Sequence, residues 1–283
     1  MKLSQLCLLI LVLFAGINVH GQILRSENPS LNLTGGIGMT GYLGDLNEKN
    51  SYFRQPSVSI SAGLSYFLNP NTGFRFDIAY SKVQANDSKN SRADLKARNV
   101  SFKSSVWDFN FAVEYDLFDM SADRKYTPYI FGGIGLCHFD PYTTDRNGNK
   151  VFLQPMGTEG QGLAAYPERK PYPRTVLELP FGGGFKYAVS DRVTLGFEFK
   201  YRYLNTDYLD DVSNFGYPNK AALTAKDPSL PMLTYRGDEL PGGAPYPSPT
   251  LNRGNPNNKD SYHSAQFTII YRLKNYSGIE INY

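Results

Sequence analysis

Few side chains in this sequence have both the type and the spacing that catalysis needs. Beyond the first 21 residues, the only histidines are His138 and His263. A hydrolase would need a histidine base beside a serine nucleophile. Ser264 directly follows His263, but adjacent residues of a strand point to opposite faces. We therefore expect no catalytic residues and no enzyme activity.

Two other patterns suggest ligands. Asp207, Asp210 and Asp211 could coordinate calcium in a loop, although a solvated acidic loop is the simpler interpretation. The run at 36–41 reads G-x-G-x-x-G, a dinucleotide fingerprint that requires a preceding strand and a following helix. Here the run lies inside an alternating segment that no helix follows, so its glycines are interpreted as relief of crowding in a strand. We expect no metal and no cofactor.

The composition excludes several classes of protein. Lysine plus arginine (29) nearly balances aspartate plus glutamate (26), which is too neutral for a nucleic-acid binder. A mean hydropathy of −0.39 argues against a helical membrane protein, and 26 Gly with 18 Pro argue against long helices. A hydrophobic share of 41% argues against a wholly disordered chain. An aromatic-rich, all-β exported protein remains.

The N-terminus predicts export. Lys2 provides a positive end, residues 6–15 form an apolar run, and the small or medium residues at 19 and 21 fit a cleavage site before Gln22. We therefore expect a signal peptide at 1–21 and a single domain at 22–283. Cleavage would leave Cys137 as the only cysteine, which excludes an intramolecular disulfide.

Alternation with a period of two runs through most of the remaining chain and predicts strands. It is strict in six segments and less clean in two more. In 127–139 apolar residues fall on both faces, so the outward side of that strand stays open. The strict segments are 57–68, 74–81, 107–117, 175–189, 193–203 and 264–273, and the less clean ones are 31–43 and 127–139.

A soluble β-sandwich would also alternate, but three features favour a membrane barrel. The strands are long, with 11 to 15 residues against about 5–6 in most globular proteins. Aromatic residues crowd their apolar faces, and short connections alternate with long ones. We predict an eight-stranded antiparallel transmembrane β-barrel of the outer membrane, with long outer loops and short periplasmic turns. The connections are 44–55, 69–72, 84–99, 118–125, 140–173, 190–191 and 205–260.

The polar faces of the strands would point into the barrel. Eight strands leave room only for side chains, and an unpaired buried charge is costly, so these charges should pair and fill the lumen. They are Arg75, Asp77, Asp108, Glu114, Asp116, Glu178, Lys186, Glu198, Lys200, Arg202 and Arg272.

Several stretches, read in order, resemble the PorG-type outer-membrane proteins of the type IX secretion system, which is linked to gliding motility. They are 41–46 (GYLGDL), 127–135 (TPYIFGGIG), 153–162 (LQPMGTEGQG), 180–186 (PFGGGFK) and 206–212 (TDYLDDV). The resemblance covers nearly all of the chain after the signal peptide, and 153–162 is its most specific part. The proline-rich stretch 216–258 is longer than the family pattern, and we expect 205–260 to be extended or partly disordered.

The resemblance implies a non-enzymatic component that sits in outer-membrane lipid and associates with the periplasmic ring of the secretion machinery. The alternative is a stand-alone small barrel, adhesin-like or a passage for small apolar solutes. The predicted topology places 153–162 and 206–212 on the outer side, whereas the implied ring is periplasmic. Either those motifs fold back into the barrel mouth, or a second partner lies outside.

The surfaces available to a periplasmic partner are few. We predict a charged contact at Asp123, Arg124 and Lys125 and apolar anchors at Tyr276, Ile279 and Tyr283, because aromatic residues often dominate interface energy. The alternation at 279–283 is equally consistent with an extension of the last strand or a role in barrel assembly.

Overall fold

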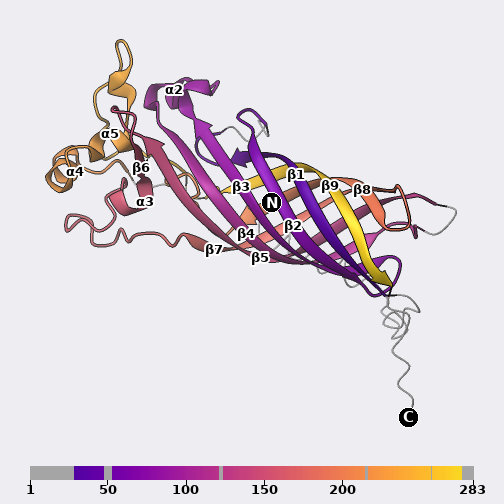
Figure 1. The fold of residues 1–283 in the computed structure, drawn as a ribbon. Helices are drawn as coiled ribbons and strands as arrows, with labels where there is room; N and C mark the ends of the chain where they lie inside the picture. The colour runs from indigo at the N-terminus through magenta and orange to yellow at the C-terminus, as the bar shows by residue number, and fades with distance from the viewer. Residues whose placement is uncertain (1–28, 48–52, 121–123, 214–215, 256, 276–283) are drawn as a thin grey trace.

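The computed structural model describes residues 29–47, 53–120, 124–213, 216–255 and 257–275 (Figure 1). Long strands form its body: β1 (Ser30–Leu43), β2 (Ser57–Phe67), β3 (Thr72–Asn86), β4 (Ser101–Asp116), β5 (Tyr126–Thr144), β7 (Thr175–Ala188), β8 (Val193–Leu204) and β9 (Ser261–Asn275). Shorter elements lie between them: η1 (Asp87–Lys89), α2 (Ala93–Arg98), β6 (Lys150–Phe152), α3 (Leu153–Met156), α4 (Lys220–Lys226), α5 (Leu230–Thr234) and η2 (Gly237–Glu239). Among the described residues, no helix is both long and apolar enough to cross a membrane.

The eight long strands close into a barrel. Each pairs antiparallel with its neighbours in the sequence, and β1 pairs with β9 from Ser30↔Asn275 to Leu43↔Ser261. The β4–β5 pairing completes the ring, and β6 adds a three-residue pairing to the end of β5. The predicted eight-stranded antiparallel barrel is therefore confirmed, with strand ends that differ from the predicted ones by a few residues. β6 is an additional short strand.

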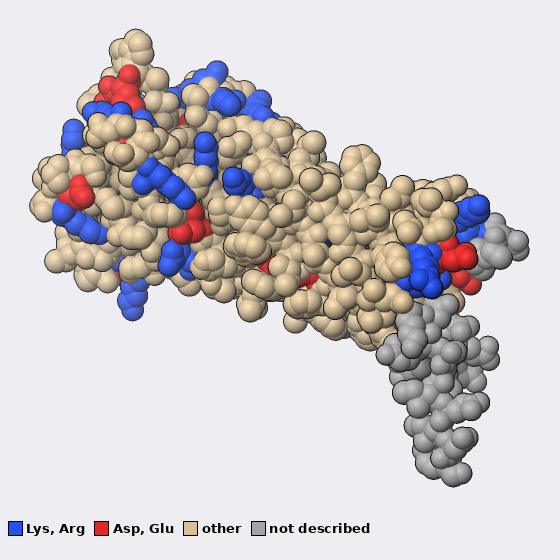
Figure 2. Space-filling model, viewed as in Figure 1, with Lys and Arg blue, Asp and Glu red and all other residues tan. Residues whose placement is uncertain are grey.

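An apolar belt surrounds the barrel on its outer side. Ile134 is 63% and Phe267 72% exposed, and outward residues along every long strand behave alike. Figure 2 shows this belt as a broad band with few charges between two charged ends. From Trp107 to Leu117 the belt spans roughly 25 Å, since strands rise about 3.3 Å per residue at a tilt of about 40°. That height matches the hydrocarbon core of a membrane, and the barrel spans it.

At the long-loop end of the belt, the outer face of the strands changes from apolar to polar, and the inner face changes from polar to apolar. Along β3, the outward residues are apolar up to Tyr80 and polar beyond it, at Lys82 and Gln84, while the inward residues become apolar at Val83 and Ala85. β4 changes in the same way, with Ser105 and Lys103 outward and Val106 and Phe102 inward. The upper ends of these strands therefore stand in water and enclose an apolar core.

The structure also settles the facing of the strand at 127–139. Ile130, Ile134 and Leu136 lie on the outer face of β5, while Tyr129 and Phe131 are buried inside. Sequence periodicity left this open because aromatic residues occupy the lumen here. Ring contacts with cations explain their position: the Arg75 guanidinium lies 4.6 Å from the centre of the Phe131 ring.

The long loops between β5 and β7 and between β8 and β9 fold into a cap at one end of the barrel (Figure 1). Leu223 from α4 and Leu230 and Leu233 from α5 are buried in the same apolar core as Phe139 of β5 and Tyr262 of β9. The expectation that 205–260 is extended or partly disordered is therefore wrong for its described residues. Its prolines do not prevent folding, because proline fits the first turn of a helix, as in α5.

Candidate functional site

The lumen holds a network of buried ion pairs centred on Arg75. Its guanidinium donates to Asp77 (2.9 Å), Glu114 (2.9 Å) and Glu198 (2.7 Å), which come from β3, β4 and β8. The Tyr129 hydroxyl also donates to Glu198, at 2.9 Å. Arg75 thus links β3, β4 and β8 through ion pairs across the lumen, because strand alternation points all of these side chains inward.

Two lysines and a second arginine extend this network along the barrel. Lys186 pairs with Glu114 and, at 2.7 Å, with Asp116, while Lys200 pairs with Asp77 at 3.1 Å. Nearer the cap, Arg202 lies 3.2 Å from Asp108. The Tyr262 hydroxyl donates to Asp108 (2.8 Å) and Glu178 (3.3 Å). These side chains cross the lumen from the level of Arg75 to the cap, and on the turn side Arg75, Glu114 and Glu198 line an open cavity.

Ten of the eleven predicted lumen charges are buried in the barrel. Arg272 is the exception: it is half-buried and lines a cavity of about 290 Å³ that opens at the turn end of the barrel. Of the predicted partner contacts, Arg124 and Lys125 are exposed beside the turn between β4 and β5, with Arg124 stacked 4.4 Å over the Phe118 ring. Asp123, Tyr276, Ile279 and Tyr283 lie outside the described residues.

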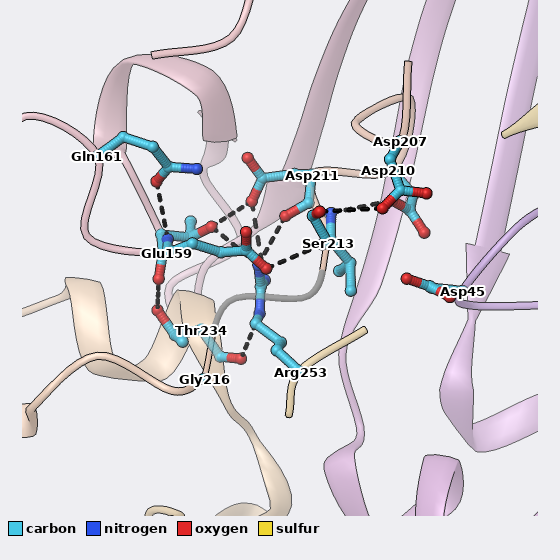
Figure 3. Close-up of polar contacts among 12 residues, drawn as sticks. Asp45, Glu159, Gln161, Asp207, Asp210, Asp211, Ser213, Gly216, Thr234 and Arg253 are labelled. Atoms are coloured by element: carbon cyan, nitrogen blue, oxygen red, sulfur yellow. Dashed lines mark hydrogen bonds and ion pairs between the residues drawn. The ribbon is translucent and has the colours of Figure 1, made fainter. Parts of the chain in front are cut away.

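A second polar network lies buried in the cap and is centred on Arg253 (Figure 3). The Arg253 guanidinium donates to Glu159 (3.2 Å), to the Asp211 carbonyl (2.6 Å) and to the Thr234 carbonyl (3.3 Å). Asp211 also accepts from the hydroxyl of Tyr172 at 2.7 Å. Arg253 comes from the loop before β9 and Glu159 from the loop after α3, so the contact joins two long loops.

Hydrogen bonds to backbone groups continue this cap network. Glu159 accepts from the Ser213 amide at 2.9 Å, and the Ser213 hydroxyl donates to Asp207 at 2.9 Å. The Gln161 side chain accepts from the Glu159 amide at 2.9 Å. The left-handed backbone of Gly160 (φ +85°) forms the tight turn between Glu159 and Gln161, a conformation that favours glycine.

A neighbouring group of carboxylates connects the cap to the barrel rim. The Tyr42 hydroxyl donates to Asp210, and Asp260 accepts from the Leu209 amide at 2.8 Å. Asp45 accepts from the Asn255 amide at 2.8 Å. A separate bidentate pair lies beside it: Arg98 donates to Asp87 at 2.7 and 2.9 Å and to the Arg253 carbonyl at 2.7 Å.

Carboxylates outnumber cations in this part of the cap, and burial raises their pKa values. Burial raises the pKa of Asp207 to about 7 and that of Asp45 to about 6. It also raises the pKa of Asp211 to about 6, although Arg253 acts in the opposite direction. Burial likewise raises the pKa of Glu159. The cap therefore takes up protons near neutral pH.

The simpler interpretation of Asp207, Asp210 and Asp211 as a solvated acidic loop is wrong, because all three are buried and bonded within the cap. Within the described ranges, no group of three or more His, Cys, Asp or Glu side chains could hold a metal ion. His263 packs at the outer wall against Phe53 and Phe199, while Ser264 accepts from Arg202 inside. These two residues point to opposite faces of β9.

Three of the segments that carry the family resemblance meet in the cap. Tyr42 and Asp45 belong to 41–46, Glu159 and Gln161 to 153–162, and the aspartates to 206–212. Sequence analysis missed Arg253 and Arg98, which hold these motifs together. Neither arginine stands in a recognisable motif, and only the tertiary fold shows their partners.

Comparison with known proteins gives a family and several similar solved structures. A family model described as "Domain of unknown function (DUF6089)" matches residues 5–154, just over half of the chain. No curated protein matches the sequence. Similar solved structures include Neisserial surface protein A (13% identity, 87% of this chain, 99% of that chain, TM-score 0.44).

Two further solved structures are similar. A major outer membrane protein from Thermus thermophilus shares 11% identity, over 87% of this chain and 99% of that chain, with a TM-score of 0.40. The attachment invasion locus protein Ail of Yersinia pestis shares 8% identity, over 87% of this chain and 98% of that chain, with a TM-score of 0.39. The closed sheet and apolar belt described above make the present chain a membrane-spanning barrel of the outer-membrane type.

Proposed function

The chain belongs to the family described as domain of unknown function DUF6089, and we propose that it is a structural outer-membrane component of the type IX protein secretion machinery. In this proposal the barrel anchors or positions the periplasmic ring of that machinery. It does so without catalysing a reaction and without a cofactor.

The ion pairs that cross the lumen are the observation that supports anchorage most directly. Arg75, Lys186 and Arg202 are buried among carboxylates at successive levels of the barrel. Opening a path through them would break several buried ion pairs at once, which is costly. A passage for small apolar solutes, one form of the stand-alone barrel that is the alternative, also conflicts with so many charges in the lumen. The barrel therefore serves as a membrane anchor.

The cap network gives a structural role to the segments that carry the resemblance to the secretion-system proteins. The motif segments 41–46, 153–162 and 206–212 build one buried polar cluster. A pattern that defines a family is expected where it specifies a folded element, and here that element is the cap. The motifs lie at the outer end, whereas the ring is periplasmic. These two positions are compatible, because the motifs have a structural role in the cap and need not touch the ring.

The turn end offers the surface for a periplasmic partner. An even number of strands places the start of β1 and the end of β9 at the same end as the short turns. Arg124 and Lys125 are exposed there, on the connection between β4 and β5. We propose that this basic pair contacts the ring.

The test compares two charge reversals in cells that carry the secretion system. R124E/K125E changes the turn end, and K170E/K220E makes the same charge change on exposed residues of the cap. We expect R124E/K125E to insert normally while recovery of ring proteins with the purified barrel falls severalfold, and K170E/K220E to behave like the wild type. Deletion of the whole chain should abolish type IX export.

Two results would contradict the proposal. One is normal type IX export in the deletion strain. The other is normal ring recovery after both R124E/K125E and removal of residues 276–283, which would move the search for partners to the cap.

A further inference from the structure

One tyrosine hydroxyl at the rim of the barrel contacts two buried carboxyl groups. The Tyr42 hydroxyl oxygen contacts Asp210 Oδ2 and, at 3.3 Å, Asp260 Oδ1. Tyr42 belongs to β1, Asp210 to the loop after β8, and Asp260 directly precedes β9. Each of the three residues is only 1% exposed. The contact therefore joins a loop of the cap to two strands of the barrel, away from water.

A count of hydrogen atoms shows that this contact needs one more than two ionised carboxylates provide. The Tyr42 hydroxyl has one hydrogen, and an ionised carboxylate can only accept. Asp210 Oδ1 already accepts from the Val212 amide at 2.9 Å, and Asp260 Oδ2 from the Leu209 amide at 2.8 Å. No other donor among the described residues bonds to Asp260 Oδ1. A proton on one of the two carboxyl groups supplies the hydrogen that the contact lacks.

The two carboxyl groups also lack a cation. Neither Asp210 nor Asp260 forms an ion pair with a described residue, whereas Asp211 and Glu159 of the same cap pair with Arg253. A buried carboxylate that has no cation is costly to keep ionised and takes up a proton instead. Burial without a counter-charge therefore favours the same proton as the count of hydrogen atoms.

The lumen contains a similar arrangement in which a cation is present. The Tyr262 hydroxyl contacts Asp108 at 2.8 Å and Glu178 at 3.3 Å. There the Arg202 guanidinium lies 3.2 Å from Asp108 and compensates negative charge. The arrangement at Tyr42 has no such ion pair among the described residues, so it depends on a proton more strongly.

The charged side chains around Asp210 and its partner are mostly acidic (Figure 3). Asp45 follows β1, and Asp207 lies in the same loop as Asp210. Arg98 of α2 is the cation whose charge reaches Asp210. Asp87 already accepts two hydrogen bonds from Arg98, at 2.7 and 2.9 Å. The surroundings therefore add negative charge to the pair and little that offsets it.

The pKa values of both carboxyl groups change in the direction that these contacts require. Burial is the main cause that raises the pKa of Asp210 and that of Asp260 well above the usual range of an aspartate, and the neighbouring carboxylates act in the same direction. Lys259, the chain neighbour of Asp260, is exposed, so water screens its charge.

We propose that Asp210 and Asp260 hold one proton between them through the Tyr42 hydroxyl, and that this proton fastens the loop at 206–212 to the barrel rim. The Asp260 carboxyl donates to the Tyr42 oxygen, and the Tyr42 hydroxyl donates to the Asp210 carboxylate. The backbone of Asp260 holds the same loop, since its amide donates to the Thr206 carbonyl at 3.0 Å.

Release of the proton to water leaves two negative charges beside one hydroxyl and weakens the contact between the loop and the rim. The folded cap binds this proton more tightly than the opened cap does. The proton therefore stabilises the cap at low pH, and this stabilisation is lost as the pH rises through the pKa of the pair in the folded cap.

The first test detects the proton directly, in the full chain in detergent with isotope-labelled aspartate. The readout is the infrared band of a protonated aspartate carboxyl group. D260N places an amide that donates at every pH, and D87N makes the same change on a carboxylate that pairs with Arg98. At about pH 8 an ordinary aspartate is ionised. We expect the wild type and D87N to keep a band that D260N lacks.

The second test measures hydrogen exchange at about pH 7. D260N should keep the protection of 206–212 within about twofold of the wild type, because the amide supplies the same hydrogen as the protonated carboxyl. Y42F removes the bridging hydroxyl and should lower that protection about tenfold, the usual effect of leaving buried polar groups unsatisfied. D87N breaks an ion pair and should lower protection around Val100 at least about tenfold.

Three outcomes would overturn the inference. An infrared band that is unchanged in D260N would show that the pair holds no proton. A loss of protection in D260N as large as that in Y42F would show that Asp260 is ionised in the folded cap. Wild-type protection in Y42F would show that the hydroxyl does not connect the two carboxyl groups. Heat-modifiable migration in gels verifies that each variant is folded.

Discussion

At the scale of single residues, two arginines organise the buried charges of this protein in two different environments. Arg75 joins strands inside the membrane-spanning barrel, and Arg253 joins loops inside the cap. Both are buried beside more than one carboxylate. Removing either cation would therefore leave negative charge uncompensated, with effects confined to one half of the molecule.

Replacing Arg253 with alanine should loosen the cap. The change leaves Glu159 and Asp211 buried without their cation, and breaking such a pair costs about 3–5 kcal/mol. Hydrogen exchange should show faster opening at 153–162 and 206–212, while the barrel still migrates as a folded species. R92A removes an exposed pair with Asp94, where about 0–1 kcal/mol is expected. Equal protection of the cap in R253A and R92A would refute the role assigned to Arg253.

Replacing Arg75 with methionine should destabilise the barrel itself. Asp77, Glu114 and Glu198 then share only Lys186 and Lys200. We expect a lower urea midpoint for unfolding from lipid vesicles, and a partial return in R75M/E198Q, because that variant also removes one carboxylate. A coupling energy of about 0.5–3 kcal/mol between the two sites is typical of contacting residues. Strictly additive effects would show that the pair does not interact.

The sequence predicted the position of a single side chain only where strand alternation specifies whether that side chain points inward or outward. The inward positions of Asp77 and Glu198 follow from alternation along β3 and β8. The burial of Asp207 does not follow from any local pattern, because it depends on Ser213 and on loops far apart in the sequence. For the same reason Arg253 could not be identified as the centre of the cap.

At the scale of elements, β3, β4 and β5 each pass from the membrane into water. β3, β4 and β5 have apolar residues outside and polar ones inside along the belt, and the opposite arrangement above it. Alternation along the chain predicted the strands well. For example, β2 starts at Ser57 and β8 at Val193, as expected. The 205–260 loop was mispredicted because proline content alone does not show that α4 and α5 can bury leucines against the rim.

Charge insertion on the outer face should reveal the boundary of the belt. Ile134→Arg places a charge within the belt, where about 2–4 kcal/mol is expected at the membrane midplane. Ser105→Arg places the same charge two residues beyond Trp107, where about 0–1 kcal/mol is expected. Folding efficiency into lipid vesicles measures both. If Ser105→Arg proved as harmful as Ile134→Arg, the boundary at Tyr80 and Trp107 would be wrong.

At the scale of the whole molecule, the stability of the cap should depend on pH. Burial raises the pKa of Asp207 to about 7 and the pKa values of Asp45 and Asp211 to about 6. The folded cap thus binds protons more tightly than the opened cap, so its stability is greatest near pH 4 and falls as the pH rises to about 7.

Hydrogen exchange of the cap measures this effect. After correction for intrinsic rates, protection of 206–212 should be at least about tenfold greater at pH 5 than at pH 7.5, since one group titrating over one pH unit changes an equilibrium tenfold. D207N should reduce the difference. Protection that rises with pH would reverse the sign and contradict the assigned direction of the pKa changes.

Topology gives a further prediction for the whole chain. Tags inserted within 84–99 or 216–258 should be labelled on intact cells, because these segments belong to the cap or its rim. A tag at 69–72, in the tight turn where the Leu68 amide donates to the Thr72 carbonyl, should be labelled only after the envelope is opened. The reverse labelling pattern would invert the orientation.

The uninterrupted strands also have a mechanical consequence. β4 and β5 run from the turn at one end to the cap at the other, and β5 is paired with β4 at 129–142 and with β7 at 126–132 and 135–138. A force applied at the turns would load many backbone hydrogen bonds in parallel and in shear. The barrel should therefore resist bending, so that a force on its inner end is carried along the strands to the cap.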